Sequence, residues 1–323
     1  MGDTVSVVVP TWNFNRRDDL ARCMVAIERQ TLTPAETIVV VDHNERLLAW
    51  ASDSFPDATV IPNRHERGVV GNRNTGIEAA SGDVVVLTDD DTEAEPDWIE
   101  RLAACFADPS VVGATGELIP LWVGAESRWF PHEFYWVFGC SYAGLPSEPA
   151  PVRNPIAANM AVRRDVVQEV GGFRQGAAPR ELRHRGTVIA GGHALEDTEL
   201  GIRIGRRRPR MKWLYEPRAT VRHAVEPEQA TLGYLIRRSY EEGGAKAMLA
   251  HLVGSEQGLA SERRHLFVVI PRGMLGGVRD FARGEFWGLA RTAAIAIGIA
   301  ATAAGYASAS LRLRATRPVP RHA

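Results

Sequence analysis

The chain has 323 residues, of which 45% are hydrophobic and 24% charged, and this composition excludes a disordered, collagen-like or coiled-coil protein. The three cysteines (Cys23, Cys105 and Cys140) are odd in number and widely spaced, which argues against a disulfide framework and a cysteine-based zinc site. The opening residues, MGDTVSVVVPTWN, carry no basic stretch before the apolar run, so we expect no cleaved signal peptide and a cytoplasmic location.

The net charge of −1 conceals a difference between the two halves of the chain. Residues 1–150 hold 10 Lys and Arg against 24 Asp and Glu, whereas residues 151–323 hold 28 against 15. This asymmetry suggests an anionic partner for the second half, such as nucleic acid, a phospholipid surface or a phosphorylated acceptor. However, the basic run Arg206–Arg210 can simply be a solvated turn, and the arginine excess can reflect genome composition. The charge alone therefore does not identify a partner.

The first 110 residues alternate strand-like and helix-like segments. We expect buried strands at 5–10, 37–41, 58–61 and 83–88, and helices at 18–29, 71–80 and 97–106. This alternation predicts a doubly wound α/β sheet with mostly parallel strands. Ligands bind at the carboxyl ends of the strands in such sheets, and two of these ends carry acids, Asp42 and Asp89–Asp91.

The pattern is less regular beyond residue 110. Residues 120–155 are rich in aromatics, proline and glycine, and we expect irregular structure lining a site. Short strands are expected at 159–162, 212–215 and 220–222, and helices at 165–169 and 198–205. From Thr231 onward the chain is expected to be helical.

The acidic triplet at the end of a strand is the most informative local feature. Two carboxylates delivered into a crevice, Asp89 and Asp91, suit a hard divalent cation such as Mg²⁺ or Mn²⁺ with phosphates as further ligands. The alternative is an acidic loop that only caps the following helix.

Five segments resemble, in order and spacing, the family 2 inverting glycosyltransferases of the GT-A fold. They are VSVVVPTWN, IVVVDHN, GVVGNRNTGIEAASGDVVVLTDDD, GGF and ALEDTELGIRI, spread over about residues 5–225. The resemblance implies a GT-A α/β catalytic domain over residues 1–225, with a helical extension over residues 226–323. It also implies a nucleotide-sugar donor and Mg²⁺ or Mn²⁺ as cofactor.

The resemblance assigns donor-binding roles to residues after the first two strands. Thr11 and Asp42 would hold the nucleoside, and Arg73 would lie near the diphosphate, where a guanidinium makes charge-assisted contacts. His43 replaces a second acid that family members often carry, which leaves the base open. Arg73 could otherwise be an ordinary helix-surface arginine.

The DxD element of the family matches Asp89–Asp91. Asp91 is expected to bind the metal directly and Asp89 to contact the ribose or sugar, whereas Asp90, within the same donor-binding triplet, should point elsewhere. His223 matches a histidine that supplies another metal ligand in many GT-A enzymes, although lone histidines are more often structural. A metal-bound imidazole must be neutral, so activity should fall at acid pH.

Glu196 and Asp197 match the ED motif of the family, which implies that Asp197 is the general base that deprotonates the acceptor hydroxyl. The alternative is a pair of acids that caps a helix. Asn159 lies in a stretch that usually borders the donor sugar. The segment Tyr234–Arg238 (YLIRR) lacks the Gln and Trp of the QxxRW element of processive members, which favours transfer of a single sugar.

The C-terminal region contains two apolar segments, His265–Val278 and Phe286–Ser310, flanked by arginines. The uncharged part, residues 292–310, is near the roughly 20 residues of a spanning helix but is rich in small residues. We expect a peripheral or shallowly embedded helix at the cytoplasmic face of the membrane, with Phe286 and Trp287 at the headgroups. The alternative is a helix that packs on the catalytic domain or on a second subunit.

These features together predict transfer of one sugar from a nucleotide-sugar, a UDP-sugar being expected, to a hydroxyl of a lipid-linked saccharide or other glycan acceptor in cell-envelope glycan synthesis. The stretch FYWVFGCSYAGLP further resembles the subset that adds hexuronic acid to lipid-linked glucose. No nucleic-acid partner is expected, and the oligomeric state is left open. A nucleotidyltransferase should carry a glycine-rich loop after the first strand, which VPTWNFNRRDDL lacks. A non-catalytic sugar-nucleotide-binding protein should have lost acids that are present here.

Overall fold

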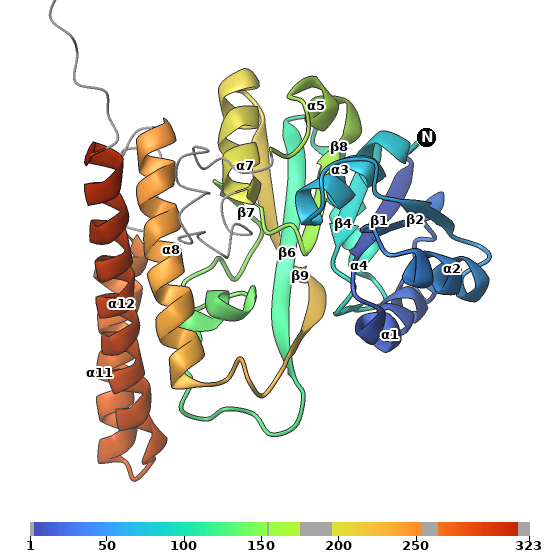
Figure 1. Cartoon of the computed structure of the whole chain (residues 1–323). Helices are drawn as coiled ribbons and strands as arrows, with labels where there is room; N and C mark the ends of the chain where they lie inside the picture. Colours follow the sequence, from blue (N-terminus) through green and yellow to red (C-terminus); the bar gives the residue numbers. More distant parts are fainter. Residues whose placement is uncertain (1–2, 154, 175–195, 254–263, 316–323) are drawn as a thin grey trace, which may run out of the picture.

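A mixed β-sheet with helices on both faces forms the larger part of the computed structural model, which describes residues 3–153, 155–174, 196–253 and 264–315 (Figure 1). Its order is β3-β2-β1-β4-β8-β6-β9-β5, with β7 also paired to β9. The strands are β1 (Val5–Thr11), β2 (Glu36–Val41), β3 (Thr59–Pro62), β4 (Val84–Thr88), β5 (Thr92–Ala94), β6 (Val111–Trp122), β7 (Ala150–Val152), β8 (Asn159–Arg163) and β9 (Lys212–Val225).

The strands β1 to β4 pair in parallel, as the alternating pattern predicted. Every residue of β1 is buried, which matches a β-branched run covered by helices on both faces. The sheet becomes mixed beyond β4, because β8 runs antiparallel to both β4 and β6. The predicted α/β class is therefore confirmed, but the sheet as a whole is mixed and not mostly parallel, since β5 and β7 also run antiparallel to β9.

Two apolar cores lie on the two faces of the sheet. One contains residues of α1, α2 and α4, and the other residues of α3, α5 and α7. The helices of the α/β part are α1 (Arg17–Glu28), α2 (Glu45–Ser54), α3 (Val69–Ala79), α4 (Trp98–Ala104), α5 (Arg164–Glu169) and α7 (Glu196–Arg207), with short 3₁₀ turns η1 (Phe14–Arg16), η2 (Cys105–Ala107) and η3 (His132–Phe138).

The expectation of two separate short strands at 212–215 and 220–222 is wrong. One long strand, β9, covers both and pairs with β6 through a shift of register, because Gly116 faces Glu216 whereas Glu117 faces Thr220. Pro217 interrupts the local pattern within this bulge. The pairing continues beyond it and carries His223 to the far end of β9.

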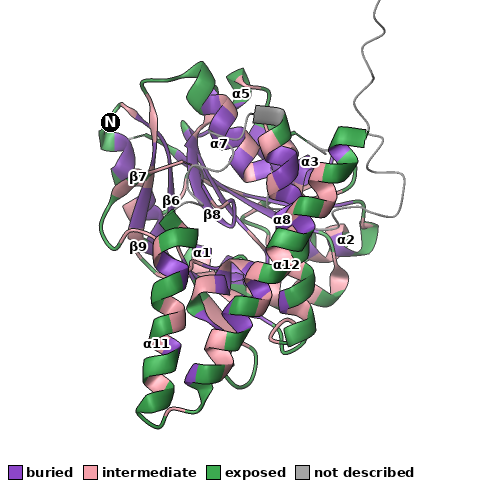
Figure 2. Cartoon of the chain, turned by 90° about the vertical axis from the view of Figure 1, so that its left-hand side faces the viewer, coloured by how far each residue is buried: buried purple, intermediate pink, exposed green. Residues whose placement is uncertain are grey.

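A layer of helices lies beside the sheet: α8 (Leu232–Val253), the π-helical turn η5 (His265–Val269), α11 (Ile270–Ala282) and α12 (Trp287–Ala315) (Figures 1 and 2). Glycines allow close packing within this layer, since a Cβ at Gly305 would lie 1.9 Å from the carbonyl oxygen of Tyr240 on α8. Gly298 lies against the ring of Phe134 in η3. Ile270 and Ile295 belong to the same apolar core as the sheet. The helical layer is thus packed firmly on the α/β part.

Candidate active site

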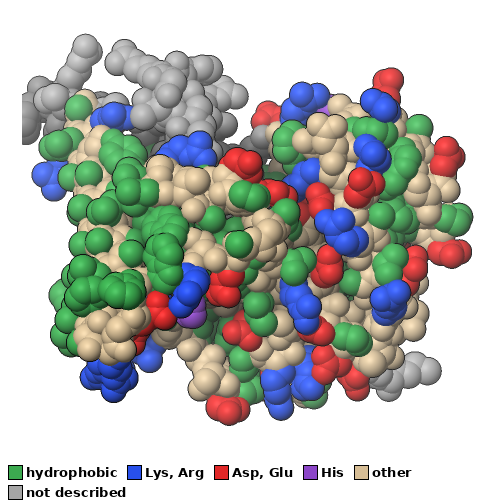
Figure 3. Space-filling view, turned by 90° about the horizontal axis from the view of Figure 1, so that it is seen from below, with side chains coloured by type: hydrophobic (Ala, Val, Ile, Leu, Met, Phe, Trp, Pro, Cys, Tyr) green, Lys and Arg blue, Asp and Glu red, His purple; other side chains and the backbone are tan. Residues whose placement is uncertain are grey.

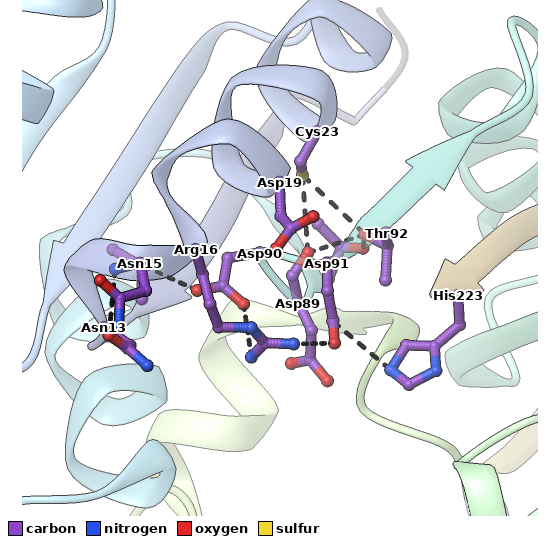
Figure 4. A network of polar contacts seen from close by, with 12 residues as sticks. Asn13, Asn15, Arg16, Asp19, Cys23, Asp89, Asp90, Asp91, Thr92 and His223 are labelled. Carbon is purple, nitrogen blue, oxygen red and sulfur yellow. Dashed lines mark hydrogen bonds and ion pairs between the residues drawn. The ribbon is translucent and has the colours of Figure 1, made fainter. Parts of the chain in front are cut away.

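Three potential metal ligands meet at the carboxyl end of β4. Asp89 and Asp91 lie in the turn between β4 and β5, and the pairing of Thr92 with His223 brings β9 alongside (Figure 4). One ligand atom from each of Asp89, Asp91 and His223 lies within 4.8 Å of the others. Their two carboxylate oxygens and one imidazole nitrogen suit Mn²⁺ or Mg²⁺. The predicted DxD and histidine residues therefore come together in one cluster that fits a divalent cation.

The ionisation of the cluster is set by its own ion pairs. Burial alone would raise the pKa of Asp91, but His223 and Arg16 lower that pKa below its usual range. Burial opposes a charged His223, yet the ion pair between its Nε2 and Asp91 Oδ1, at 3.4 Å, raises the pKa of the imidazole. The ion pair thus favours the protonated form of His223, and any such proton must be lost before Nε2 can act as a metal ligand.

Asp90 turns away from the cluster and joins the triplet to β1. Its Oδ2 accepts a hydrogen bond of 2.6 Å from the Thr11 hydroxyl, and its Oδ1 lies 3.0 Å from Arg16. Burial raises the pKa of Asp90 to about 7, although Arg16 and Thr11 oppose this. Since the Thr11 hydroxyl donates its hydrogen bond to Asp90, the role of Thr11 in this structure is to hold the acidic triplet in place.

Asp42 lies at the carboxyl end of β2, next to Thr11 across the sheet. Its carboxylate accepts hydrogen bonds from Asn63 Nδ2 at 2.8 Å and from the Gly68 amide at 2.9 Å. His43 lies 2.8 Å from the same carboxylate and has a left-handed backbone with φ of 49°, which is uncommon outside glycine. The half-exposed imidazole of His43 is therefore held at the rim of this part of the site.

Arg73 connects the metal cluster to the ED motif. It lies on α3 and is buried, with its guanidinium 3.0 Å from Asp89 and 3.4 Å from Asp197. Its Nη1 is also 3.9 Å from Glu196, and the ring of Phe173 covers it at 5.6 Å. Arg73 is thus not a surface arginine, and one side chain joins both acidic motifs.

Asp197 lies in the first turn of α7, where Oδ2 accepts a hydrogen bond of 2.8 Å from the Ala157 amide. Burial raises the pKa of Asp197 to about 7, with Arg73 opposing and Glu196 adding to the rise. A carboxylate with this pKa can accept a proton near neutral pH.

The arrangement agrees with the comparison to known protein families. The family described as Glycosyl transferase family 2 matches residues 6–171. This chain belongs to that family. It is a glycosyltransferase, and the acidic cluster with Arg73 and Asp197 is its candidate active site.

The names of similar proteins agree with this assignment. The chain is 32% identical over 249 residues to a glucosyl-dolichyl phosphate glucuronosyltransferase of Haloferax volcanii, covering 76% of this chain and 77% of the relative. It is 26% identical over 173 residues to a dolichol-phosphate mannosyltransferase of Pyrococcus furiosus, which covers 51% of this chain and 48% of the relative. It is likewise 26% identical over 250 residues to a pre-mycofactocin glycosyltransferase of Mycobacterium tuberculosis, covering 76% of this chain and 47% of the relative.

The fold is shared with the mannosyltransferase PcManGT from Pyrobaculum calidifontis in complex with GDP-Man and Mn²⁺. The TM-score is 0.55 at 17% identity, covering 94% of this chain and 87% of that structure. GalNAc-T7 with UDP, GalNAc and Mn²⁺ gives a TM-score of 0.50 at 16% identity, covering 77% and 51%. The predicted GT-A fold of the glycosyltransferase is thereby confirmed.

Asn159, expected near the donor sugar, has its side chain committed within the core of the glycosyltransferase. Its Oδ1 accepts from the Trp98 indole at 2.8 Å, and its Nδ2 donates to the carbonyls of Glu117 and Ala219. The residue is fully buried. We therefore assign Asn159 to the structure that holds β8, β6 and β9 together.

Two polar residues of the site were missed by the sequence analysis. Asn63, which follows β3, orients Asp42, and Arg16 at the end of η1 pairs with both Asp90 and Asp91 (Figure 4). The position of Asn63 directly after a strand is the sequence feature that could have marked it as a site residue. The pair Arg16–Arg17 offered no sign of which arginine turns inward.

Proposed function

We propose that this glycosyltransferase moves a single sugar, with inversion, from a nucleotide-sugar to a hydroxyl of a lipid-linked saccharide in cell-envelope glycan synthesis. A UDP-sugar is the expected donor. The observation that carries the proposal is the position of Arg73, whose guanidinium contacts Asp89 of the metal cluster and Asp197 of the ED motif. A leaving group held at the cluster and a hydroxyl activated by Asp197 would therefore share one site.

Asp197 is proposed to act as the general base. Oδ2 is fixed by the Ala157 amide, while Oδ1 lies near Arg73. This geometry holds the carboxylate in one orientation. An acceptor hydroxyl that gives its proton to Asp197 attacks the anomeric carbon from the side opposite to the departing nucleotide, which accounts for inversion. Such a base contributes about 10²–10⁴-fold to the rate.

Asp91, His223 and Asp89 are proposed to hold the divalent cation, with Mn²⁺ or Mg²⁺ as the candidates. When bound, the cation would neutralise charge on the leaving diphosphate. Arg73 lies beside Asp89 as a permanent positive charge and is proposed to contact the diphosphate as well. Asp42, with His43 beside it, is proposed to contact the nucleoside.

A lipid-linked acceptor is supported by relatives and by the surface of the helical layer. The names of the Haloferax and Pyrococcus relatives both include a dolichyl or dolichol phosphate. Among the described residues, α12 is the one helix long and apolar enough to cross a membrane, with 22% of its most apolar window buried. The resemblance of FYWVFGCSYAGLP to enzymes that add hexuronic acid is in line with the name of the Haloferax relative, a glucuronosyltransferase. We therefore propose a hexuronic acid as the first donor sugar to test.

The outer face of α12 is uncharged over most of its length. Exposed residues of this face include Leu289, Ala293, Ala296, Ala300, Ala303, Ala307 and Leu311. Leu275 and Val278 of α11 are exposed, and Phe286 at the turn between the two helices is 78% exposed. Hydrophobic side chains gather on this side of the molecule, whereas charged side chains are dispersed over the remainder (Figure 3). The inner face of α12 packs on α8, so we propose that the helix lies on the cytoplasmic leaflet and does not cross it.

The catalytic proposal is tested by a donor-hydrolysis and transfer screen across UDP-, GDP- and dTDP-sugars with Mn²⁺. We expect Asp197→Asn to lose about 10²–10⁴-fold in transfer while it still binds donor. Asp53→Asn, an exposed residue of α2, is the matched control and should retain activity. Full transfer by Asp197→Asn would disprove the role of the base.

The membrane proposal is tested by sedimentation of the full chain with vesicles that contain anionic lipid. Replacement of Phe286 and Trp287 by Ser should reduce binding at least several-fold, because both side chains are expected at the headgroups. Val25→Ser changes an exposed apolar residue of α1 and should leave binding unchanged. Equal binding by all three proteins would contradict a docking role for this helical turn.

A further inference from the structure

Arg16 is a second positive charge at the metal cluster, and it comes from outside the family motifs. Its Nη1 lies 3.0 Å from Asp90 Oδ1, and its Nη2 pairs with Asp91 Oδ2 (Figure 4). The other oxygen of Asp91 faces His223. Both carboxylate oxygens of the expected metal ligand therefore already face a basic side chain, and on the Oδ2 side this is the permanently charged guanidinium of Arg16.

Arg16 and Arg73 differ in how firmly they are held. The Arg73 side chain is 6% exposed and is enclosed by Asp89, Asp197 and Phe173. The Arg16 side chain is 32% exposed and belongs to a single 3₁₀ turn directly after β1. Among the described residues, its ion pairs at the cluster are with Asp90 and Asp91. Arg16 is thus more exposed than Arg73 and is held by the acidic triplet, whereas Arg73 is enclosed by both acidic motifs and an aromatic ring.

A divalent cation at Asp91 would lie next to the guanidinium of Arg16. An arginine keeps its charge at any pH at which the protein is folded, so the repulsion cannot be relieved by loss of a proton. It can be relieved by movement of Arg16 onto an anion. Guanidinium groups bind phosphate oxygens in a bidentate manner, and a nucleotide-sugar carries two phosphates at this position in the proposed function.

We propose that Arg16 makes metal binding depend on the diphosphate. Without a nucleotide, Arg16 neutralises Asp90 and Asp91 and competes with the divalent cation. With a nucleotide, the guanidinium moves onto the diphosphate and leaves Asp91 to the metal. Arg16 is therefore a positioning residue that links two binding events, and this inference rests on the metal-dependent function proposed above.

The proposal predicts reciprocal coupling between metal and nucleotide. Removal of the Arg16 charge should strengthen Mn²⁺ binding in the absence of nucleotide by about tenfold, which corresponds to about 1.4 kcal/mol. The same change should weaken UDP binding and reduce the enhancement of Mn²⁺ affinity by UDP. A residue with only a structural role would lower both affinities or neither.

The test is a Mn²⁺ titration of the full chain, followed by the electron paramagnetic resonance signal of free Mn²⁺, with and without UDP. The variants are Arg16→Gln, Arg16→Lys and Arg17→Gln. Arg16→Lys keeps the charge and should bind Mn²⁺ as weakly as the parent protein. Arg17 neighbours Arg16 but forms an ion pair at 3.6 Å with the exposed Asp18, so Arg17→Gln should also leave Mn²⁺ affinity unchanged.

Two results would overturn the inference and are distinguishable. If Mn²⁺ binds in a manner that Asp91→Asn weakens, but Arg16→Gln binds it no more tightly than the parent, the role of Arg16 is disproved while the metal site stands. If Asp91→Asn leaves Mn²⁺ binding unchanged with and without UDP, the metal site itself fails, and the role of Arg16 fails with it. Circular dichroism of each variant establishes that it is folded.

Discussion

Replacement of Asp197 by Asn should make the metal-free protein more stable while it removes activity. Asp197 has a side chain that is only 13% exposed, and burial raises its pKa from 3.8 to about 7. One pKa unit corresponds to about 1.4 kcal/mol, so ionisation of Asp197 costs the folded state about 4 kcal/mol. Asn has a similar shape and no charge, and its side-chain oxygen can still accept the hydrogen bond from the Ala157 amide.

The sign and the pH range of this effect follow from proton linkage. Between the ordinary and the raised pKa, the folded state binds a proton that the unfolded state has lost, so the stability of the parent protein falls as pH rises. The stability of the Asn variant does not fall with pH for this reason, because Asn does not ionise. We expect its advantage in the free energy of unfolding to be about 2 kcal/mol at pH 5 and about 4 kcal/mol at pH 8.

The assay is urea unfolding of both proteins after EDTA treatment, followed by tryptophan fluorescence at the two pH values. Asp18→Asn, at an exposed position of α1, is the control and should change stability by less than about 0.5 kcal/mol. A variant that is less stable than the parent at pH 8, or an advantage of equal size at both pH values, would refute the argument from the buried charge.

Three further outcomes follow from the structure. The value of kcat/KM should fall about tenfold for each pH unit below about 7, because Asp197 acts in its ionised form. A flat pH profile of kcat/KM between pH 5 and 7 would contradict this. Asn159→Leu should lower the free energy of unfolding, measured in urea, by about 2–4 kcal/mol, since three hydrogen bonds inside the protein lose a partner. A change below about 1 kcal/mol would show that these hydrogen bonds contribute little to stability. Gly305→Val should lower the melting temperature measured by circular dichroism, because even a Cβ would lie 1.9 Å from the Tyr240 carbonyl oxygen. An unchanged melting temperature would show that α8 and α12 can separate at little cost in stability.

The parts of the fold that could be predicted are those in which local pattern decides structure. The β-branched runs of β1, β2 and β4 are recognisable because strands buried on both faces require continuous apolar residues. The acidic triplet is visible because it directly follows such a run. The GT-A fold then follows from the order of the motifs, which the resemblance supplied.

The remaining features depend on pairing between distant parts of the chain. The register of β5 on β9 places His223 beside Asp91, and no local pattern encodes that register. Arg16 pairs with Asp90 and Asp91 whereas Arg17 pairs with the exposed Asp18, and no local pattern distinguishes these two neighbouring arginines. Asn159 lies near site residues in the sequence pattern of the family, yet in space it bonds to the Trp98 indole and to two backbone carbonyls. Tertiary contacts therefore decide which polar side chains reach the site.

The packing of α12 determines how its apolar outer face can be made polar without disturbing the core. Truncation before α12 would uncover Phe134 where Gly298 now covers it, and would expose the face of α8 that meets Gly305. Substitution of lysine or glutamate along the alanine face, at Ala296, Ala300 and Ala303, changes only the side of the helix that faces outward. Substitution of these exposed alanines preserves the buried half of the helix, so redesign of the surface is preferable to truncation of the chain.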